Sequence, residues 1–237
     1  TFASGLRALL RQDPNIIMVG EIRDGETADL AVQAALTGHL VFSTLHTNNA
    51  ATCLPRLLDM GIEPFLIAST VRIVIGQRLV RRLCPDCREP YTPDATELRE
   101  IAKVFGLNDS ANYSHLHVLE KSALAGGIGA TNPSKTNKHD PGKLSTTEKD
   151  ITVLWRSHED GCDNCNHTGY RSRMGIYEVL TNTSGVQQLI VSNSTSDKLQ
   201  DFALNEGMVT MQTDGLVKAL RGQTSVEEIL RVTAEKS

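Results

Sequence analysis

The 237-residue chain lacks a basic surplus, a long apolar run and a large complement of aromatic side chains. It has 24 Lys and Arg residues and 28 Asp and Glu residues, so it has no excess of positive charge. Because general nucleic-acid binding depends on such an excess, no nucleic-acid partner is expected. The longest apolar stretch, Phe65 to Ile75, is interrupted by Arg72 and is shorter than the ~18 residues of a membrane span. We therefore expect no transmembrane segment.

The sequence also lacks an initial methionine and the basic-then-apolar order of a signal peptide. Four of its five cysteines form two Cys-x-x-Cys pairs, and this arrangement fits a reducing compartment with a metal better than a secreted disulfide scaffold. We expect a cytoplasmic protein, of which this sequence is an internal or C-terminal part.

Residues 1–83 show strands and helices in alternation, which is typical of an α/β fold: a parallel sheet with crossover helices. Strands are bounded by turn formers, and the first helix has a glycine at its C-terminal end. The expected elements are a strand at Ile16–Val19, a helix at Glu26–Thr37, a strand at His39–Leu45, a helix at Asn49–Met60 and a helical stretch at Pro64–Arg82.

The remaining sequence divides into two further parts. Residues 84–174 hold the cysteine pairs, and the segment 108–150 within them is rich in Ser, Thr, Asn, Gly and Lys, so no regular structure is expected there. Residues 175–237 begin with a short strand and continue as a small, mostly helical domain. A capping-box pattern at Ser225–Glu228 predicts the start of the last helix.

One acidic residue, Glu21, follows the first predicted strand. A carboxylate at the C-terminal edge of a parallel sheet can orient water or hold Mg²⁺ beside a nucleotide, which makes Glu21 a candidate general base. The second strand begins at His39, contains Thr44 near its end and is closed by His46, and we expect Thr44 and His46 beside Glu21 at the same edge of the sheet. The alternatives are a solvated acid and histidines that merely bond loop carbonyls.

The two thiol pairs, Cys84 with Cys87 and Cys162 with Cys165, predict a structural Zn²⁺ site with four thiolate ligands. The long separation of the pairs is tolerable, since closure entropy rises only by about 0.6 kcal/mol for each doubling of loop length. His167 is an alternative ligand. Metal-free reduced turns and a redox site remain open as other interpretations.

Longer motifs carry a resemblance to a known family. They look like the Walker B and histidine boxes, and the cysteine element, of the secretion ATPase superfamily, and most closely resemble the type IV pilus assembly ATPases and their type II secretion counterparts. The matching segments are Arg7–Asp24, Thr37–Asn48, Met60–Phe65, Gln77–Cys87 and Gly161–Arg171.

The resemblance implies a RecA-like P-loop ATPase domain, ATP with Mg²⁺, and a homo-hexameric ring at the cytoplasmic face of the inner membrane. It also implies a membrane platform protein as partner and hydrolysis coupled to the extraction of pilin subunits. By position, Glu21 corresponds to the Walker B glutamate and His39 and His46 to the histidine box. The resemblance therefore implies that these three residues are catalytic and that Thr44 contacts the nucleotide. Arg7 and Arg11 correspond to arginines near the nucleotide or a subunit boundary.

The phosphate-binding motif Gly-x4-Gly-Lys-Ser/Thr is missing upstream of Ile16, as is the acidic box of the family. The nearest string, Gly129–Thr136, has Ser134 in place of the second glycine and follows no apolar strand. We therefore expect a C-terminal portion of the enzyme that is inactive alone. The alternative functions are a type II secretion ATPase or, for this part of the chain alone, a non-catalytic, zinc-stabilised assembly module.

Overall fold

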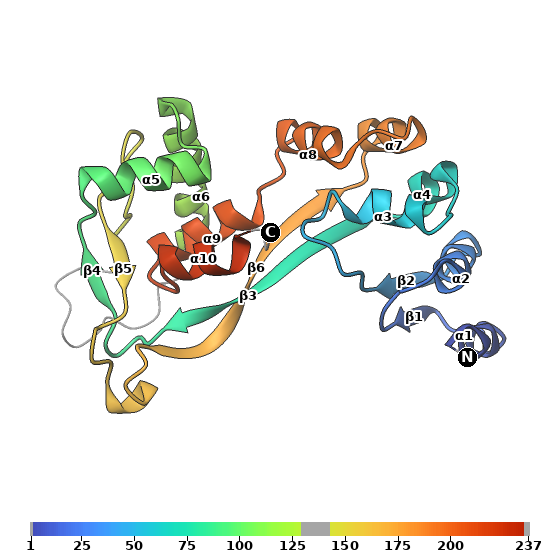
Figure 1. Cartoon of the computed structure of the whole chain (residues 1–237), viewed down its shortest axis with the longest axis horizontal. Coiled ribbons are helices and arrows are strands. Elements are labelled where there is room, and N and C mark those ends of the chain that lie inside the picture. The colour runs from blue at the N-terminus through green and yellow to red at the C-terminus, as the bar shows by residue number, and fades with distance from the viewer. Residues whose placement is uncertain (1, 129–142, 235–237) are drawn as a thin grey trace. The chain divides into compact units, whose positions relative to one another are not determined.

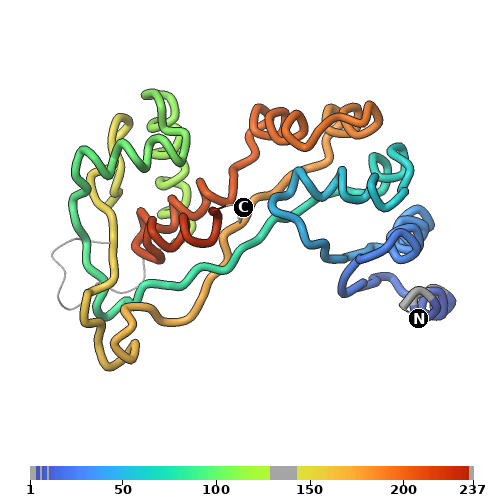
Figure 2. Tube along the Cα trace, viewed as in Figure 1, coloured from blue at the N-terminus to red at the C-terminus, as the bar shows by residue number. Residues whose placement is uncertain are grey.

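The computed structural model describes residues 2–128 and 143–234, which form two compact units. The first unit comprises residues 1–76 and 178–209, and the second comprises residues 77–177 and 210–237. The chain leaves the first unit along strand β3 (Ile73–Leu83) and returns along its pairing partner β6 (Tyr170–Thr181), as the trace in Figure 2 shows.

The first unit is built around a parallel pair of strands joined by a helix (Figure 1). In this pair Ile16 lies opposite Leu40 and Val19 opposite Ser43. The connecting helix starts where the Asp24 carboxylate accepts a hydrogen bond from the backbone N–H of Thr27 at 2.8 Å. The elements are α1 (Phe2–Leu10), β1 (Ile16–Val19), α2 (Gly25–Leu36), β2 (Leu40–Ser43), α3 (Cys53–Asp59), α4 (Pro64–Thr70), α7 (Ser184–Val191) and α8 (Ser196–Asn205), with the beginning of β3 and the end of β6.

The two faces of this parallel pair differ. Ile17 and Val19 point into the core of the unit, where α2 contributes a buried row of small and branched side chains. The opposite face is apolar but exposed. It consists of Ile16, Met18, Leu40 and Phe42, each of which exposes at least half of its surface, between 52% and 64%.

Strands β1 and β2 and helix α2 agree with the sequence-based prediction, and α1 was not predicted. The predicted helical stretch Pro64–Arg82 is wrong in its second half. Helix α4 ends at Thr70, and residues 73–83 form β3. The β-branched residues that begin β3 lose side-chain freedom in a helix and pack well in a strand. Gly76 weakens a helix further.

The second unit holds a short pair of strands and several helices. The pair is antiparallel, with Glu89 opposite Arg156. Helix α9 packs against α6, α10 and β5. The elements are β4 (Glu89–Tyr91), α5 (Ala95–Phe105), α6 (Ser110–Ala125), β5 (Leu154–Arg156), a 3₁₀ turn at Asp163–Cys165, α9 (Met211–Leu220) and α10 (Val226–Thr233), with the remainder of β3 and β6.

The expectation of no regular structure between residues 108 and 150 is wrong for residues 110–125, which form α6. Asp109 caps this helix by accepting a hydrogen bond from the N–H of Asn112 at 2.8 Å. Its buried side consists of Leu116, Glu120 and Ala123. Because Glu120 is charged, the spacing of apolar residues that would indicate a helix is interrupted.

Some expectations fall outside this description. The string Gly129–Thr136, the nearest approach to a phosphate-binding loop, lies outside the described residues. The domain boundaries at residues 83 and 174 stay a prediction. Within the described ranges, no helix combines the length and the apolar character needed to cross a membrane.

Candidate functional site

Glu21, directly after β1, is the centre of a small polar group in the first unit. Its Oε1 lies 2.7 Å from Nε2 of His46, and its Oε2 lies 2.7 Å from a guanidinium nitrogen of Arg23. The Glu21 side chain is 22% exposed, whereas those of His46 and Arg23 are 85% and 77% exposed. The carboxylate is therefore partly sheltered, and its two partners reach it from the solvent side.

Thr44 connects the ends of the two strands. Its hydroxyl donates to the carbonyl oxygen of Gly20 at 2.6 Å, and its own carbonyl oxygen accepts from the N–H of Ile22 at 3.0 Å. These bonds continue the parallel pairing for a few residues beyond β1 and β2. They hold the backbone on both sides of Glu21 against the strand that leads to His46.

The charge state of Glu21 follows from its partners. The hydrogen bond from Arg23, together with the nearby His46, outweighs partial burial and lowers the pKa of the Glu21 carboxyl below its ordinary value. Glu21 is therefore ionised at neutral pH. Each carboxylate oxygen can accept more than one hydrogen bond, so the group can still bind and orient a water molecule.

The other predicted site residues lie elsewhere in the same unit. His39 precedes β2, at the end opposite His46, and its Nδ1 lies 3.0 Å from the carbonyl oxygen of Ala34, in α2. Arg7 on α1 pairs with Glu26 at 3.0 Å, and both side chains are more than half exposed. Arg11 is exposed just after α1. The structure brings His46 and Thr44, but not these three residues, to the Glu21 group.

Sequence reasoning missed three residues that shape this site. Arg23, only two positions after Glu21, carried a local signal as a basic residue beside a candidate acid. Glu178 and Gln200 contact the loop that follows His46, through Ala50 and Asn49 respectively. They carried no such signal, since both lie more than 120 residues away in the sequence.

The four paired cysteines meet in the second unit. Their sulfur atoms all lie within 4.8 Å of one another. Neighbouring sulfurs are 3.7 Å apart for Cys84 and Cys162, 3.8 Å for Cys87 and Cys165, and 3.7 Å for Cys162 and Cys165. Four sulfurs at about 2.3 Å from a tetrahedral Zn²⁺ ion lie about 3.8 Å from one another, so the donor set fits this ion closely.

The surrounding backbone also favours a metal site. Burial raises the pKa of the Cys84 and Cys87 thiols. Burial acts in the same direction on Cys165, but N–H groups of Cys162 and Gly169 point at its sulfur and lower its pKa to about 6. A divalent cation is the group that lets all four thiols ionise together. The four cysteines can therefore hold a metal ion.

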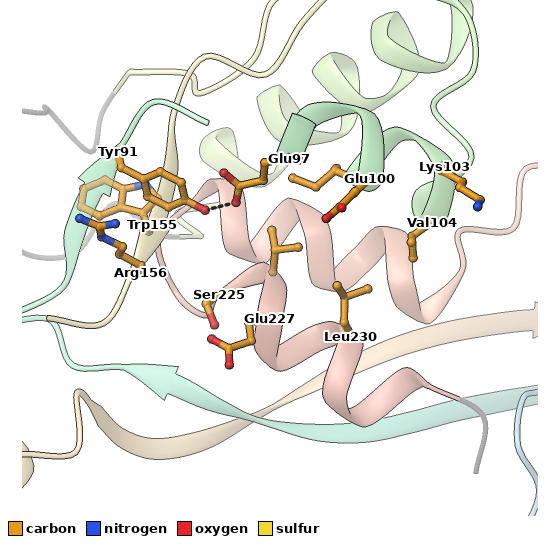
Figure 3. A pocket seen from close by; sticks show the side chains of 12 residues that line it. Tyr91, Glu97, Glu100, Lys103, Val104, Trp155, Arg156, Ser225, Glu227 and Leu230 are labelled. Atoms are coloured by element: carbon orange, nitrogen blue, oxygen red, sulfur yellow. Dashed lines mark hydrogen bonds between the residues drawn. The ribbon is translucent and has the colours of Figure 1, made fainter. Parts of the chain in front are cut away.

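An open groove of about 680 Å³ lies in the second unit between α5 and α10 (Figure 3). At one end the hydroxyl of Tyr91 donates to Glu97 at 2.5 Å, and the Arg156 guanidinium lies over the Tyr91 ring. No predicted site residue lines the groove. It is therefore separate from both the Glu21 group and the cysteine site.

Comparison with known proteins agrees with these features. The family model described as "Type II/IV secretion system protein" matches residues 1–231. The type II secretion system ATPase E of Vibrio cholerae is 43% identical over 235 residues, which cover 99% of this chain and 38% of that protein. The type IV pilus assembly ATPase PilB of Myxococcus xanthus is 39% identical and matches 98% of this chain and 34% of its own length. The chain thus spans little more than a third of these relatives.

Solved structures show the same fold. The pilus retraction motor PilT with bound ADP aligns over all of this chain and 44% of its own, with a TM-score of 0.56 and 22% identity. The Legionella pneumophila ATPase DotB aligns over 97% of this chain and 41% of its own, with a TM-score of 0.52 and 20% identity. The predicted α/β ATPase fold and the family resemblance are confirmed, and the chain belongs to the type II/IV secretion system protein family.

Proposed function

We propose that the full-length protein hydrolyses ATP to power the assembly of a type IV pilus, by extracting pilin subunits from the inner membrane. The observation that carries this proposal is the Glu21 group. It places a carboxylate with a lowered pKa at the C-terminal end of a parallel pair, where α/β folds bind their ligands.

In this proposal Glu21 is the general base that orients the attacking water. His46 contacts Glu21 directly and responds to the γ-phosphate, since an imidazole can donate or accept a hydrogen bond. Thr44, Arg7 and Arg11 contact the nucleotide or the neighbouring subunit. His39, which caps the end of α2, acts indirectly, through the strand that connects it to His46.

ATP and Mg²⁺ require groups that this sequence does not contain. A phosphate cradle of the form Gly-x4-Gly-Lys-Ser/Thr is absent from the sequence. One apolar face of β1 and β2 is exposed, whereas parallel sheets are normally covered on both faces. This supports the proposal that the present chain contains only part of the nucleotide-binding domain. We propose that other residues of the full-length protein cover this face and bind the phosphates, and that the present chain alone is inactive.

The cysteine site is proposed to bind one structural Zn²⁺ ion. All four ligands are thiols, so the site has no open position for catalysis. Asp86 accepts a hydrogen bond from the amide of Asn164 at 3.0 Å, which joins the two cysteine turns directly. The ion would stabilise the second unit rather than take part in hydrolysis.

Type II secretion is the second candidate, and one observation favours it: the relatives named type II secretion ATPase or protein E are 42–43% identical, against 39–40% for the named pilus ATPases. In either role we propose a homo-hexamer on an inner-membrane platform protein, at the cytoplasmic face. Deletion of the gene in its host separates the two roles, since loss of surface pili supports pilus assembly and loss of secreted proteins supports type II secretion.

The enzymatic part is tested with the full-length protein. Glu21→Gln should lower kcat by about 10²–10⁴ if this carboxylate is the general base, while ATP binding remains. The matched control is Asp29→Asn on α2, whose carboxylate bonds only Gln33 among the described residues and should leave kcat unchanged. An unchanged kcat in Glu21→Gln would remove Glu21 from the mechanism.

A further inference from the structure

The segment between β2 and α3, residues 44–52, carries His46 and is called the histidine loop here. Its second half is folded on itself. Asn49 Oδ1 accepts from the N–H of Thr52 at 2.9 Å, and the hydroxyls of Thr47 and Thr52 donate to the carbonyl oxygen of Asn49 at 3.0 and 2.9 Å. A constraint applied at Asn49 is therefore transmitted to Thr47, the neighbour of His46.

Glu178 on β6 constrains the next residue of the loop, Ala50. Glu178 is only 4% exposed, and its Oε1 accepts the backbone N–H of Ala50, itself 1% exposed, at 2.5 Å. Gly76 on β3 makes room for it, because a Cβ at that position would lie 2.7 Å from Glu178 Cγ. The carboxylate thus occupies a fitted place beside the loop.

Gln200 on α8 supplies a second constraint at the adjacent residue. Its Oε1 accepts a hydrogen bond from Nδ2 of Asn49 at 2.8 Å. The ring of His46 has no comparable support from burial, since it is 85% exposed. Its 2.7 Å contact with Glu21 depends on the position of the loop backbone.

We propose that Glu178 and Gln200 are positioning residues for hydrolysis: they fix the histidine loop so that His46 reaches Glu21. The inference rests on the proposed function. A displacement of about 1 Å in a catalytic group can cost about 10²-fold in rate, so loss of these anchors should lower turnover without preventing ATP binding.

The first test measures ATP hydrolysis by the full-length protein. Glu178→Leu should lower kcat about tenfold with KM for ATP within about twofold, because ground-state binding is retained. Glu178→Gln should restore most of the rate, since its amide oxygen can accept the same N–H. The matched control is Asn182→Leu, which removes side-chain hydrogen bonds to the carbonyl oxygens of Ala68 and Val71 in the same unit and should lower stability without lowering kcat.

The second test asks whether Glu178 acts through His46. In a double-mutant cycle, Glu178→Leu should have little further effect on kcat in the His46→Ala background. Additive losses, or an unchanged kcat in folded Glu178→Leu, would overturn the proposal. If Glu178→Leu fails to fold, Gln200→Met replaces it, because that side chain is only half-buried on α8.

A third readout does not need activity. Amide hydrogen exchange in residues 46–52 of the full-length protein should quicken about tenfold in Glu178→Leu and stay at the wild-type rate in Asn182→Leu. Unchanged exchange in Glu178→Leu would refute the anchoring role. Failure of the proposed function looks different: Glu21→Gln would then hydrolyse ATP as well as the wild type, whatever the exchange rates.

Discussion

The buried ion pair between Glu120 on α6 and Arg221 after α9 should carry a large share of the stability of the second unit. Its side chains are 0% and 1% exposed, with 3.2 Å between Glu120 Oε1 and the Arg221 guanidinium. The carboxylate also accepts the N–H groups of Ser145 and Thr146 at 2.8 and 3.0 Å, and the Thr146 hydroxyl at 2.6 Å. Its acceptor sites are therefore filled.

Arg221 uses its other N–H groups to fix two distant parts of the chain. Its Nε donates to the carbonyl oxygen of Ile128 at 3.2 Å, and its Nη1 donates to that of Lys143 at 2.9 Å. The pair therefore joins α6, α9 and the chain on both sides of residues 129–142. Removal of the Glu120 charge takes this carboxylate away from a buried guanidinium.

For Glu120→Gln we expect the free energy of unfolding to fall by about 3–5 kcal/mol, as for other broken buried pairs. At about 2.1 cal/mol/K of unfolding entropy per residue, a unit of this size should lose roughly 10–20 °C of melting temperature. Trp155, the only tryptophan, is buried in this unit, so its fluorescence in urea reports the transition. The control is Glu89→Gln, whose exposed pair with Arg156 should contribute no more than about 1 kcal/mol.

A loss below about 1 kcal/mol in Glu120→Gln, with an unchanged urea slope, would refute this reasoning. The double variant Glu120→Leu with Arg221→Met gives a second check. Apolar replacement of both partners removes both buried charges, so it should be less destabilising than Glu120→Gln alone. A double variant that is less stable than Glu120→Gln would show that the backbone hydrogen bonds, rather than the charge pair, dominate.

Three further predictions follow from the sites. Elemental analysis should find one zinc ion per chain, absent from Cys165→Ser but kept in Cys53→Ser, whose buried thiol lies outside the cysteine site; stoichiometric zinc in Cys165→Ser would contradict the four-thiolate site. Arg23→Ala should raise the pKa of Glu21 and move the acidic limb of the pH profile of kcat of the full-length enzyme to higher pH. An unmoved limb would show that the ion pair between Glu21 and Arg23 does not control this part of the profile. Burial opposes ionisation of Glu228, but hydrogen bonds from two arginines lower its pKa below the ordinary 4.5. Ionised Glu228 should stabilise the folded chain fully above pH 4.5, and this stabilisation should be lost as the pH falls through the lower pKa of the folded state. Urea midpoints should therefore show that Glu228→Gln is destabilising at about pH 7 and less destabilising in acid.

The elements that the sequence predicted well are those whose signals are local. Strand β1 is a short β-branched run between turn formers, and α2 has an N-cap, a small-residue face and a terminal glycine. Helix α6 was missed because its buried row contains Glu120, whose partner Arg221 lies 101 residues away. Its burial is favourable only once that partner is in place, and hydrophobic periodicity carries no information about this.

The same distinction separates the two parts of the candidate site. The cysteine pairs could be predicted across 78 residues of sequence, because the chemistry of a metal demands one particular side chain at each ligand position. The anchors of the histidine loop could not, since Glu178 bonds a backbone N–H and every residue except proline offers one. A sequence thus predicts a site in which every contributing residue must have one particular kind of side chain. Where one end is the backbone, only the folded chain shows which residue is held and which catalytic group is thereby positioned.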